Sequence, residues 1–147
     1  MPELTTLKLA RDAVEAKWIT DWATTTPYCF DNENFDPPAL GTVTAQNLYS
    51  ACWCRLVVRN RFSTKETLGA APRFERWAAI MIQVFVPVDT GRTDSDTLAQ
   101  TARAVFEGLS FSGVKCHPGN VREAGVDGRW YQVNVEIPFT YYETVTT

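Results

Sequence analysis

The sequence has a single histidine, no excess of positive charge and no long uninterrupted run of apolar residues. Its 147 residues include 14 lysines and arginines against 17 aspartates and glutamates, a formal net charge of −3. This balance argues against a protein that holds nucleic acid by neutralising phosphates, because counterion release needs a basic surface. The N-terminus mixes charged with apolar residues, unlike a signal peptide, and no segment is long enough to span a membrane. We therefore expect a cytosolic protein without membrane contact.

Motifs for catalysis are scarce as well. His117 is the one candidate base for a hydrolytic triad, and no Gly-x-Ser-x-Gly elbow accompanies it. The stretch VPVDTGRTDSD, residues 86–96, lacks the glycine and lysine spacing of a phosphate-binding loop. We favour a surface histidine and an ordinary strand-to-helix turn. The sequence therefore predicts no enzymatic activity and no cofactor.

The four cysteines do not have the spacing of a common metal site. Cys52 and Cys54 are separated by one residue, whereas zinc knuckles have a gap of two, and Cys29 and Cys116 lie far away in the sequence. In a reducing compartment a buried thiol behaves as a small hydrophobic side chain, which is the interpretation we favour. A site of four thiolates for zinc is the alternative.

Apolar and aromatic residues are plentiful. Apolar residues make up 45% of the chain, which includes five tryptophans and eight phenylalanines, so the composition is globular rather than disordered. A chain of this length fits one domain that buries roughly two thirds of its unfolded surface. We expect a single domain over residues 1–147. So many aromatic residues also point to surfaces that partners bury.

Two segments have the periodicity of amphipathic helices. The first runs from residue 2 or 3 to about residue 23 and repeats apolar side chains on one face. That face consists of Leu4, Leu7, Val14, Trp18 and Trp22. The second follows capping candidates at residues 93–96 and stops near Gly108. Its buried stripe consists of Leu98, Ala102, Val105, Phe106 and Leu109.

Residues 53–62 and 76–86 are predicted strands joined by a polar arm, residues 63–73. The first alternates between two faces. One face consists of Trp53, Arg55, Val57, Arg59 and Arg61, and the other of Cys54, Leu56, Val58 and Phe62. The second strand is apolar on both faces, which indicates cover on both sides, by both helices or by one helix and a neighbouring subunit.

A second hairpin is predicted at the end of the chain. Asp127 and Gly128 form a strong turn signal between two extended segments. Pro138 removes a ladder donor and places its part of the strand near an edge or bulge. A possible short strand covers residues 28–30. The order helix, hairpin, helix, hairpin predicts an α+β fold, a mainly antiparallel sheet of two hairpins packed by two helices.

Five segments, in this order, resemble the phage tail terminator-like proteins, the family that includes the lambda-type tail terminator. They are FDNENFDPP (30–38), WCRLVV (53–58), RWAAIMIQVFVPVDTG (76–91), DTLAQTARAVFEG (96–108) and GRWYQVNVEIPFTYYE (128–143). The resemblance implies an α+β subunit that assembles as a ring, usually of six copies, on the head-proximal end of a completed long tail. Such a ring stops tube polymerisation and provides the surface to which the head attaches.

The resemblance also implies partners and a location. The partners are further copies in the ring, the major tail tube protein and a head-completion protein, while DNA passes through the lumen without specific binding. The subunit is expected in the bacterial host cytoplasm during assembly and then in the virion tail. The family offers no catalytic residues to carry over.

The candidate subunit and tube interface combines the aromatic strand with the basic strand and arm. It consists of Arg55, Arg59, Arg61, Lys65, Arg73, Trp77, Met81 and Phe85. Two alternatives stay open. One is a head-completion or connector subunit, and the other is a small-molecule-binding or enzymatic α+β domain with the aromatic sheet as its pocket.

Overall fold

A computed structural model of the chain describes residues 5–22, 25–31, 52–65, 67, 69, 72–88 and 92–144. The elements within them are α1 (Leu7–Trp22), β1 (Tyr28–Phe30), β2 (Trp53–Lys65), β3 (Arg73–Pro87), α2 (Thr93–Phe106), β4 (Ser110–Phe111), β5 (Val114–Cys116), β6 (Asn120–Asp127) and β7 (Trp130–Thr144). Of the described residues, 53% lie in strands and 27% in helices, so the protein is mostly β.

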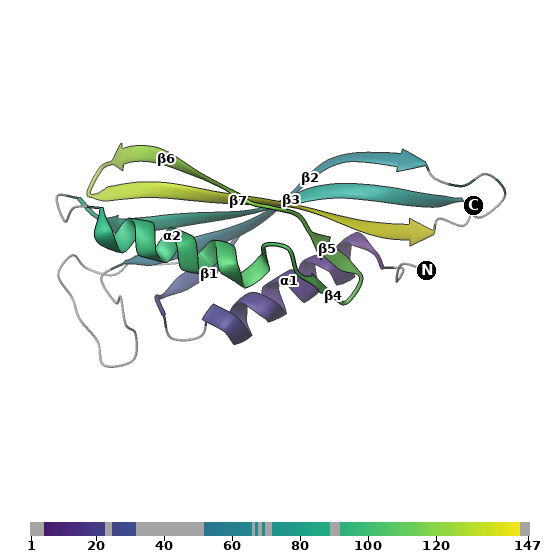
Figure 1. Cartoon of the computed structure of the whole chain (residues 1–147), viewed down its shortest axis with the longest axis horizontal. Coiled ribbons are helices and arrows are strands. Elements are labelled where there is room, and N and C mark those ends of the chain that lie inside the picture. Colours follow the sequence, from purple (N-terminus) through teal and green to yellow (C-terminus); the bar gives the residue numbers. More distant parts are fainter. Residues whose placement is uncertain are drawn as a thin grey trace.

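The strands form one curled sheet in the order β1-β2-β3-β7-β5-β4, and β6 also pairs with β7. Strand β7 accommodates both neighbours because its first half pairs with β6, whereas Phe139 and Thr140 pair with β5. Both helices lie on one side of the sheet (Figure 1). The opposite side, which we call the open face, is formed by the odd-numbered residues of β3 and their partners on β2 and β7.

The predicted fold class is wrong. The structure is not an α+β fold with a mainly antiparallel sheet of two hairpins packed by two helices, but a mostly β half-barrel with a mixed sheet. Strand β1 joins β2 in parallel, which makes the sheet mixed. Strands β4 and β5 have only two and three residues, too few to show a period of two in the sequence.

Helix α1 begins later than its apolar pattern predicts. The backbone N–H of Thr5 donates to the carbonyl of Tyr142 on β7 at 2.8 Å, so Thr5 is bound to the sheet rather than to a helix. The hydroxyl of Thr6 then accepts from the N–H of Leu9 at 3.3 Å, which caps the first turn. The buried stripe is confirmed at Val14, Trp18 and Trp22.

Helix α2 packs beside α1 on the helix-covered face of the sheet. Its stripe is confirmed from Leu98 to Phe106, but Leu109 follows the helix and is 43% exposed. Gly108, with φ of +72°, ends the helix as predicted. The predicted capping side chains do not cap it, because Arg92 occupies the N-cap position and makes no side-chain cap.

The main core lies between the helices and this face of the sheet. The five even-numbered residues of β3 between positions 78 and 86 are apolar and all fully buried there. They are Ala78, Ile80, Ile82, Val84 and Val86. On β2 the same core takes Cys54, Leu56 and Val58. The alternation in the sequence therefore places the helix-covered face of both strands correctly.

A β-bulge in β2 overturns the predicted position of Phe62. Asn60 pairs with Ala78 and Ser63 with Arg76, so β2 contains one residue more than β3 at this point. The extra residue reverses the alternation beyond it. Phe62 consequently lies on the open face, stacked on Trp77 with ring centroids 5.6 Å apart, rather than beside Leu56.

The C-terminal hairpin is confirmed with a shift of one residue. Asp127 pairs with Trp130, so the turn consists of Gly128, with φ of +63°, and Arg129. Pro138 lies in β7 between the residues paired with β6 and those paired with β5. Its carbonyl accepts from the N–H of His117 at 2.8 Å. The missing N–H of Pro138 therefore falls where one neighbouring strand ends and the next begins.

Gly119 occupies a crowded position between β5 and β6. A Cβ atom there would lie 2.8 Å from Cγ1 of Ile137 and 3.2 Å from the carbonyl oxygen of Glu136. We expect Gly119→Ala to lower the free energy of unfolding by about 1–3 kcal/mol, because β7, which carries Glu136 and Ile137, must move to make room for the added methyl group. Urea unfolding followed by circular dichroism measures this loss. In the control Gly128→Asn the Cβ meets open space and asparagine tolerates positive φ, so an equal loss there would contradict crowding as the cause.

Candidate subunit and tube interface

The open face carries seven of the eight predicted interface residues. Arg73, Trp77, Met81 and Phe85 are odd-numbered residues of β3, and Arg55 and Arg59 pair with residues on the same face. Arg61, in the bulge, reaches Glu136, the partner of Met81. Lys65 is separated from them because it pairs with Phe74 beyond the bulge, on the other face.

One end of the open face is closed by an aromatic cluster. Trp53 stacks on Phe85 with ring centroids 4.1 Å apart and meets Trp130 edge-on at 6.1 Å. Cys29 completes the cluster, and Phe85 is only 5% exposed. Phe85 therefore packs within its own chain, and its contact with a neighbouring subunit stays a prediction.

The other end of the open face carries a stack of three rings. Trp77 lies between Phe62, at 5.6 Å, and His117, at 5.0 Å, with interplanar angles of 17° in both pairs. Nε2 of His117 is 3.3 Å from the hydroxyl of Thr140. Phe62 is 62% exposed, so its outer side can receive a partner. His117 could not be assigned to this site from the sequence, because only the sheet brings it to Trp77.

Polar side chains occupy the middle of the open face. Nη1 of Arg55 donates to Oε1 of Gln83 at 3.4 Å, and Arg59 is 3.5 Å from the carboxylate of Asp31. Arg61 forms an ion pair with Glu136. Three of the four predicted arginines, Arg55, Arg59 and Arg61, are therefore each engaged by a side chain of the same subunit. At these exposed positions such pairs contribute little to stability and orient the side chains instead.

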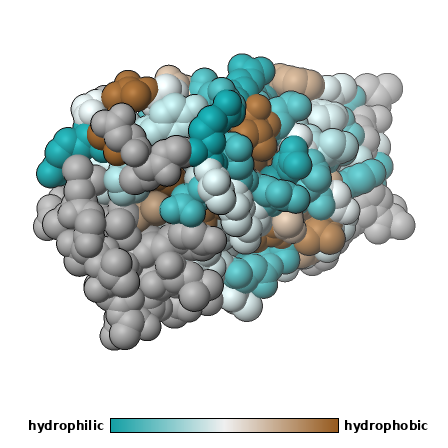
Figure 2. All heavy atoms as spheres, turned by 60° about the vertical axis from the view of Figure 1, so that its left-hand side comes forward, coloured by the Kyte–Doolittle hydropathy of each residue, from teal (hydrophilic) through white to brown (hydrophobic). Residues whose placement is uncertain are grey.

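Exposed apolar side chains are scattered rather than gathered. In the part of the chain that the structure describes, the large ones are Leu9, Ile19, Phe62, Leu109, Val121 and Val126. On the side drawn in Figure 2, hydrophobic residues form separate patches among hydrophilic ones. Binding at this surface would therefore depend on a few apolar anchors within a polar surround, as in many interfaces between soluble proteins.

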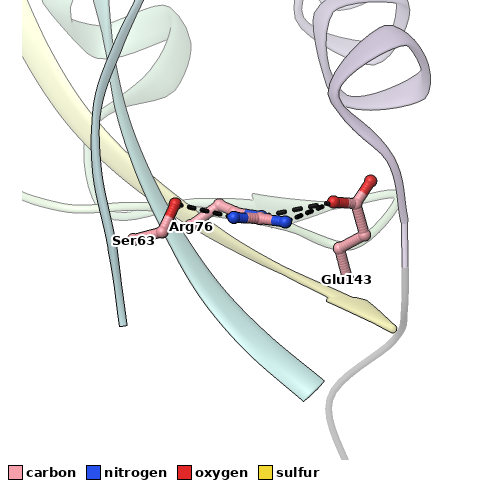
Figure 3. Close-up of polar contacts among 3 residues, drawn as sticks. All are labelled: Ser63, Arg76 and Glu143. Carbon is pink, nitrogen blue, oxygen red and sulfur yellow. Dashed lines mark hydrogen bonds and ion pairs between the residues drawn. The ribbon is translucent and has the colours of Figure 1, made fainter. Parts of the chain in front are cut away.

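A polar clamp formed by Ser63, Arg76 and Glu143 holds strands β2, β3 and β7 together on the face opposite the open one. The guanidinium of Arg76 donates to Oε1 of Glu143 from Nε at 3.2 Å and from Nη2 at 2.9 Å. Its Nη1 donates to the hydroxyl of Ser63 at 3.0 Å. Arg76 thus joins a residue of β2 to a residue of β7 across its own strand (Figure 3).

The β4–β5 turn and the Arg76–Glu143 pair each border a cavity. A cavity of about 390 Å³ lies against the β4–β5 turn, between Ser110–Lys115 and the side chains of Thr140 and Tyr142. A second, of about 290 Å³, lies between Leu7 and the Arg76–Glu143 pair. Neither contains a cysteine, and His117 lines neither.

The four cysteines are buried and none forms a disulfide. Burial raises the pKa of Cys52, Cys54 and Cys116 to about 12, because the thiolate loses its hydration. In the described part of the chain, no group of three or more His, Cys, Asp and Glu side chains is arranged to hold a metal ion. Cys52, Cys54 and Cys116 are therefore protonated at neutral pH.

We expect a disulfide reagent at pH 8 to modify these thiols at least about 10²-fold more slowly in the folded protein than in urea. Because the folded protein keeps Cys52, Cys54 and Cys116 protonated, the folded state has its full stability below about pH 8.5, the pKa of a thiol in the unfolded chain. This stability is lost as the pH rises toward 12, the pKa of these thiols in the folded protein. A colorimetric thiol assay measures both rates. A thiol that reacts equally fast in both states would contradict its burial.

Comparisons with known proteins identify the fold and nothing further. No family model and no curated protein sequence matches the chain. One solved structure superposes with a TM-score of 0.65 and 17% sequence identity, over 93% of this chain and 96% of the other, and its name describes neither activity nor partner. At this identity the likeness shows a shared fold alone. No helix in the described segments is long and apolar enough to cross a membrane.

Proposed function

We propose that the chain is a structural virion subunit of the tail terminator type. It forms a ring, of six copies by the usual number of the family it resembles, at the head-proximal end of a long phage tail. The ring ends tube polymerisation and provides the surface for head attachment. Its partners are copies of itself, the major tail tube protein and a head-completion protein. It resides in the host cytoplasm during assembly and then in the virion tail.

The open face is the observation that supports this proposal. No helix of the described residues lies on this face of the sheet, and Phe62 and Trp77 present stacked rings at one end of it. Such a surface gains stability when another protein covers it, and a ring supplies that cover through one repeated contact.

Light scattering of the purified protein, alone and with isolated tail tubes, tests the proposal. The expected result is a ring-sized oligomer, or a monomer that assembles once tubes are added. A protein that stays monomeric in both conditions and leaves tubes uncapped contradicts it. Electron microscopy of phage lacking the gene separates the head-completion alternative, because loss of a terminator gives overlong tails and loss of a head-side protein gives tails of normal length.

A further inference from the structure

In the described part of the chain the sheet has two free margins, one along β2 and one along β6, and their free segments lie at opposite ends of the sheet in Figure 1. Strand β1 pairs only with Cys54–Leu56 of β2, so residues 57–65 have no strand beyond them among the described residues. At the other margin, β6 pairs with β7 and with no other described strand. Residues 59–65 of β2 and most of β6 are exposed. Unpaired margins of this kind are templates for strand addition.

The backbone groups that face outward on β2 can be assigned from two hydrogen bonds. The N–H of Cys54 donates to Pro27 at 3.1 Å, and the carbonyl of Val58 accepts from Arg11 at 3.4 Å, both away from β3. Because backbone direction alternates along an antiparallel pair, the next outward residues are Asn60 and, past the bulge, Ser63 and Lys65.

The same reasoning assigns the margin at β6. The carbonyl groups of Pro138 and Tyr142 on β7 accept bonds from His117 and Thr5, so even-numbered residues of β7 point away from β3. The β6 residues paired with them, Asn120, Arg122 and Gly125, point toward β7. The outward backbone groups of β6 therefore belong to Val121, Glu123 and Val126.

The two margins match in direction, apolar content and charge. Strands β2 and β6 are antiparallel within the sheet, so copies that lie side by side with corresponding strands in nearly the same direction meet with antiparallel margins. Phe62 at one margin and Val121 and Val126 at the other are exposed apolar residues. The free part of β2 has three basic residues and no acid, whereas β6 has one arginine and two acids. Like charge therefore opposes pairing of two β2 margins.

The margins are also offset along the strands. Asn60 lies beside Ala78 and hence Phe139 of β7, whereas Glu123 lies beside Val133. If Asn60 of one copy pairs with Glu123 of the next, the second copy is displaced by about 20 Å along the strand direction, the length of six residues. Each copy contributes four strands, which together are roughly 19 Å wide. The resulting tilt of about 45° is close to that of strands in closed barrels. The offset thus fits a closed ring of curled sheets.

We infer that the free margin of β2, residues 59–65, pairs with β6 of a second copy of this chain, so that the sheet continues from subunit to subunit. The inference rests on the proposed ring and names its contact. Each junction is heterologous, one margin against a different one, as ring closure requires.

Residue-resolved amide hydrogen exchange of monomer and assembled ring tests the inference. We expect exchange to slow at least about 10²-fold on assembly at the outward amides of Asn60, Ser63 and Lys65 and of Val121, Glu123 and Val126. Amides of Val57 and Arg59, which point toward β3, should change little. A ring whose outward amides still exchange at the monomer rate overturns this contact and leaves the proposed function standing. A chain that never assembles overturns both.

A proline variant tests the same point through assembly. Asn60→Pro removes one outward N–H without removing a bond to β3, and Asn60→Ala keeps that N–H. We expect Asn60→Pro to weaken assembly at least about tenfold, measured by concentration-dependent light scattering, while the alanine control assembles normally. Circular dichroism verifies that both monomers fold. Equal assembly by a folded Asn60→Pro variant overturns the inference.

Discussion

Replacing Trp18 by alanine is expected to lower the free energy of unfolding by about 3–5 kcal/mol, the range for a large aromatic side chain removed from a core. Trp18 is fully buried and central to the contact between the helices. Its ring stacks on Trp22 with centroids 4.3 Å apart and lies 6.3 Å from that of Phe106 on α2. A domain stable by roughly 5–15 kcal/mol would lose a large part of its stability. Urea unfolding followed by far-ultraviolet circular dichroism measures the change.

Two phenylalanine variants separate packing from hydrogen bonding at this site. Nε1 of Trp18 has no hydrogen-bond partner among the described residues, whereas Nε1 of Trp22 donates to the hydroxyl of Thr26 at 2.9 Å. Trp18→Phe therefore removes a buried donor without a partner and should cost less than about 1.5 kcal/mol. Trp22→Phe breaks a buried bond and should cost about 1 kcal/mol more. The reverse order of the two losses would contradict this assignment.

Long periodic segments were predictable, and short or interrupted ones were not. The stripe of Val14, Trp18 and Trp22 repeats over four turns, so the helix could be assigned even though its first residue could not. The first residue depends on Thr5, whose bond to β7 is a tertiary contact. Strands β1, β4 and β5 have two or three residues each, and only their neighbours in the sheet stabilise them. The sequence predicts a short strand at residues 28–30 but neither its parallel pairing nor β4 and β5, which led to the wrong fold class.

The candidate interface was partly predictable for the same reason. Trp77, Met81 and Phe85 recur every four residues of one strand, which places them on one face whatever the fold. The bulge at Asn60 could not be foreseen, because the side chains continue to alternate through it in the sequence. It separates Lys65 from the other candidates and brings Phe62 to Trp77. The contact of Trp77 with His117 depends on where β5 meets β7, which no local pattern encodes.

Replacing Phe62 by serine is expected to weaken ring assembly at least about tenfold, equivalent to about 1.4 kcal/mol per contact. Phe62 is the outermost ring of the stack on Trp77 and lies at the free margin of β2. Since its side chain is 62% exposed, its loss should change the stability of the monomer only by about the value of one aromatic pair, 0.5–1.5 kcal/mol. Concentration-dependent light scattering in the presence of tail tubes measures assembly, and urea unfolding measures the monomer.

The matched control for Phe62 is Ile19, which is 49% exposed on α1, on the opposite side of the sheet from the open face. Ile19→Ser removes a comparable exposed apolar side chain at a position that the proposed contact does not use. Assembly of this variant should equal that of the unmodified protein. If both variants lost assembly equally, general surface hydrophobicity rather than the open face would drive association. If neither did, Phe62 would not be an anchor, and the subunit contact would have to lie elsewhere on the molecule.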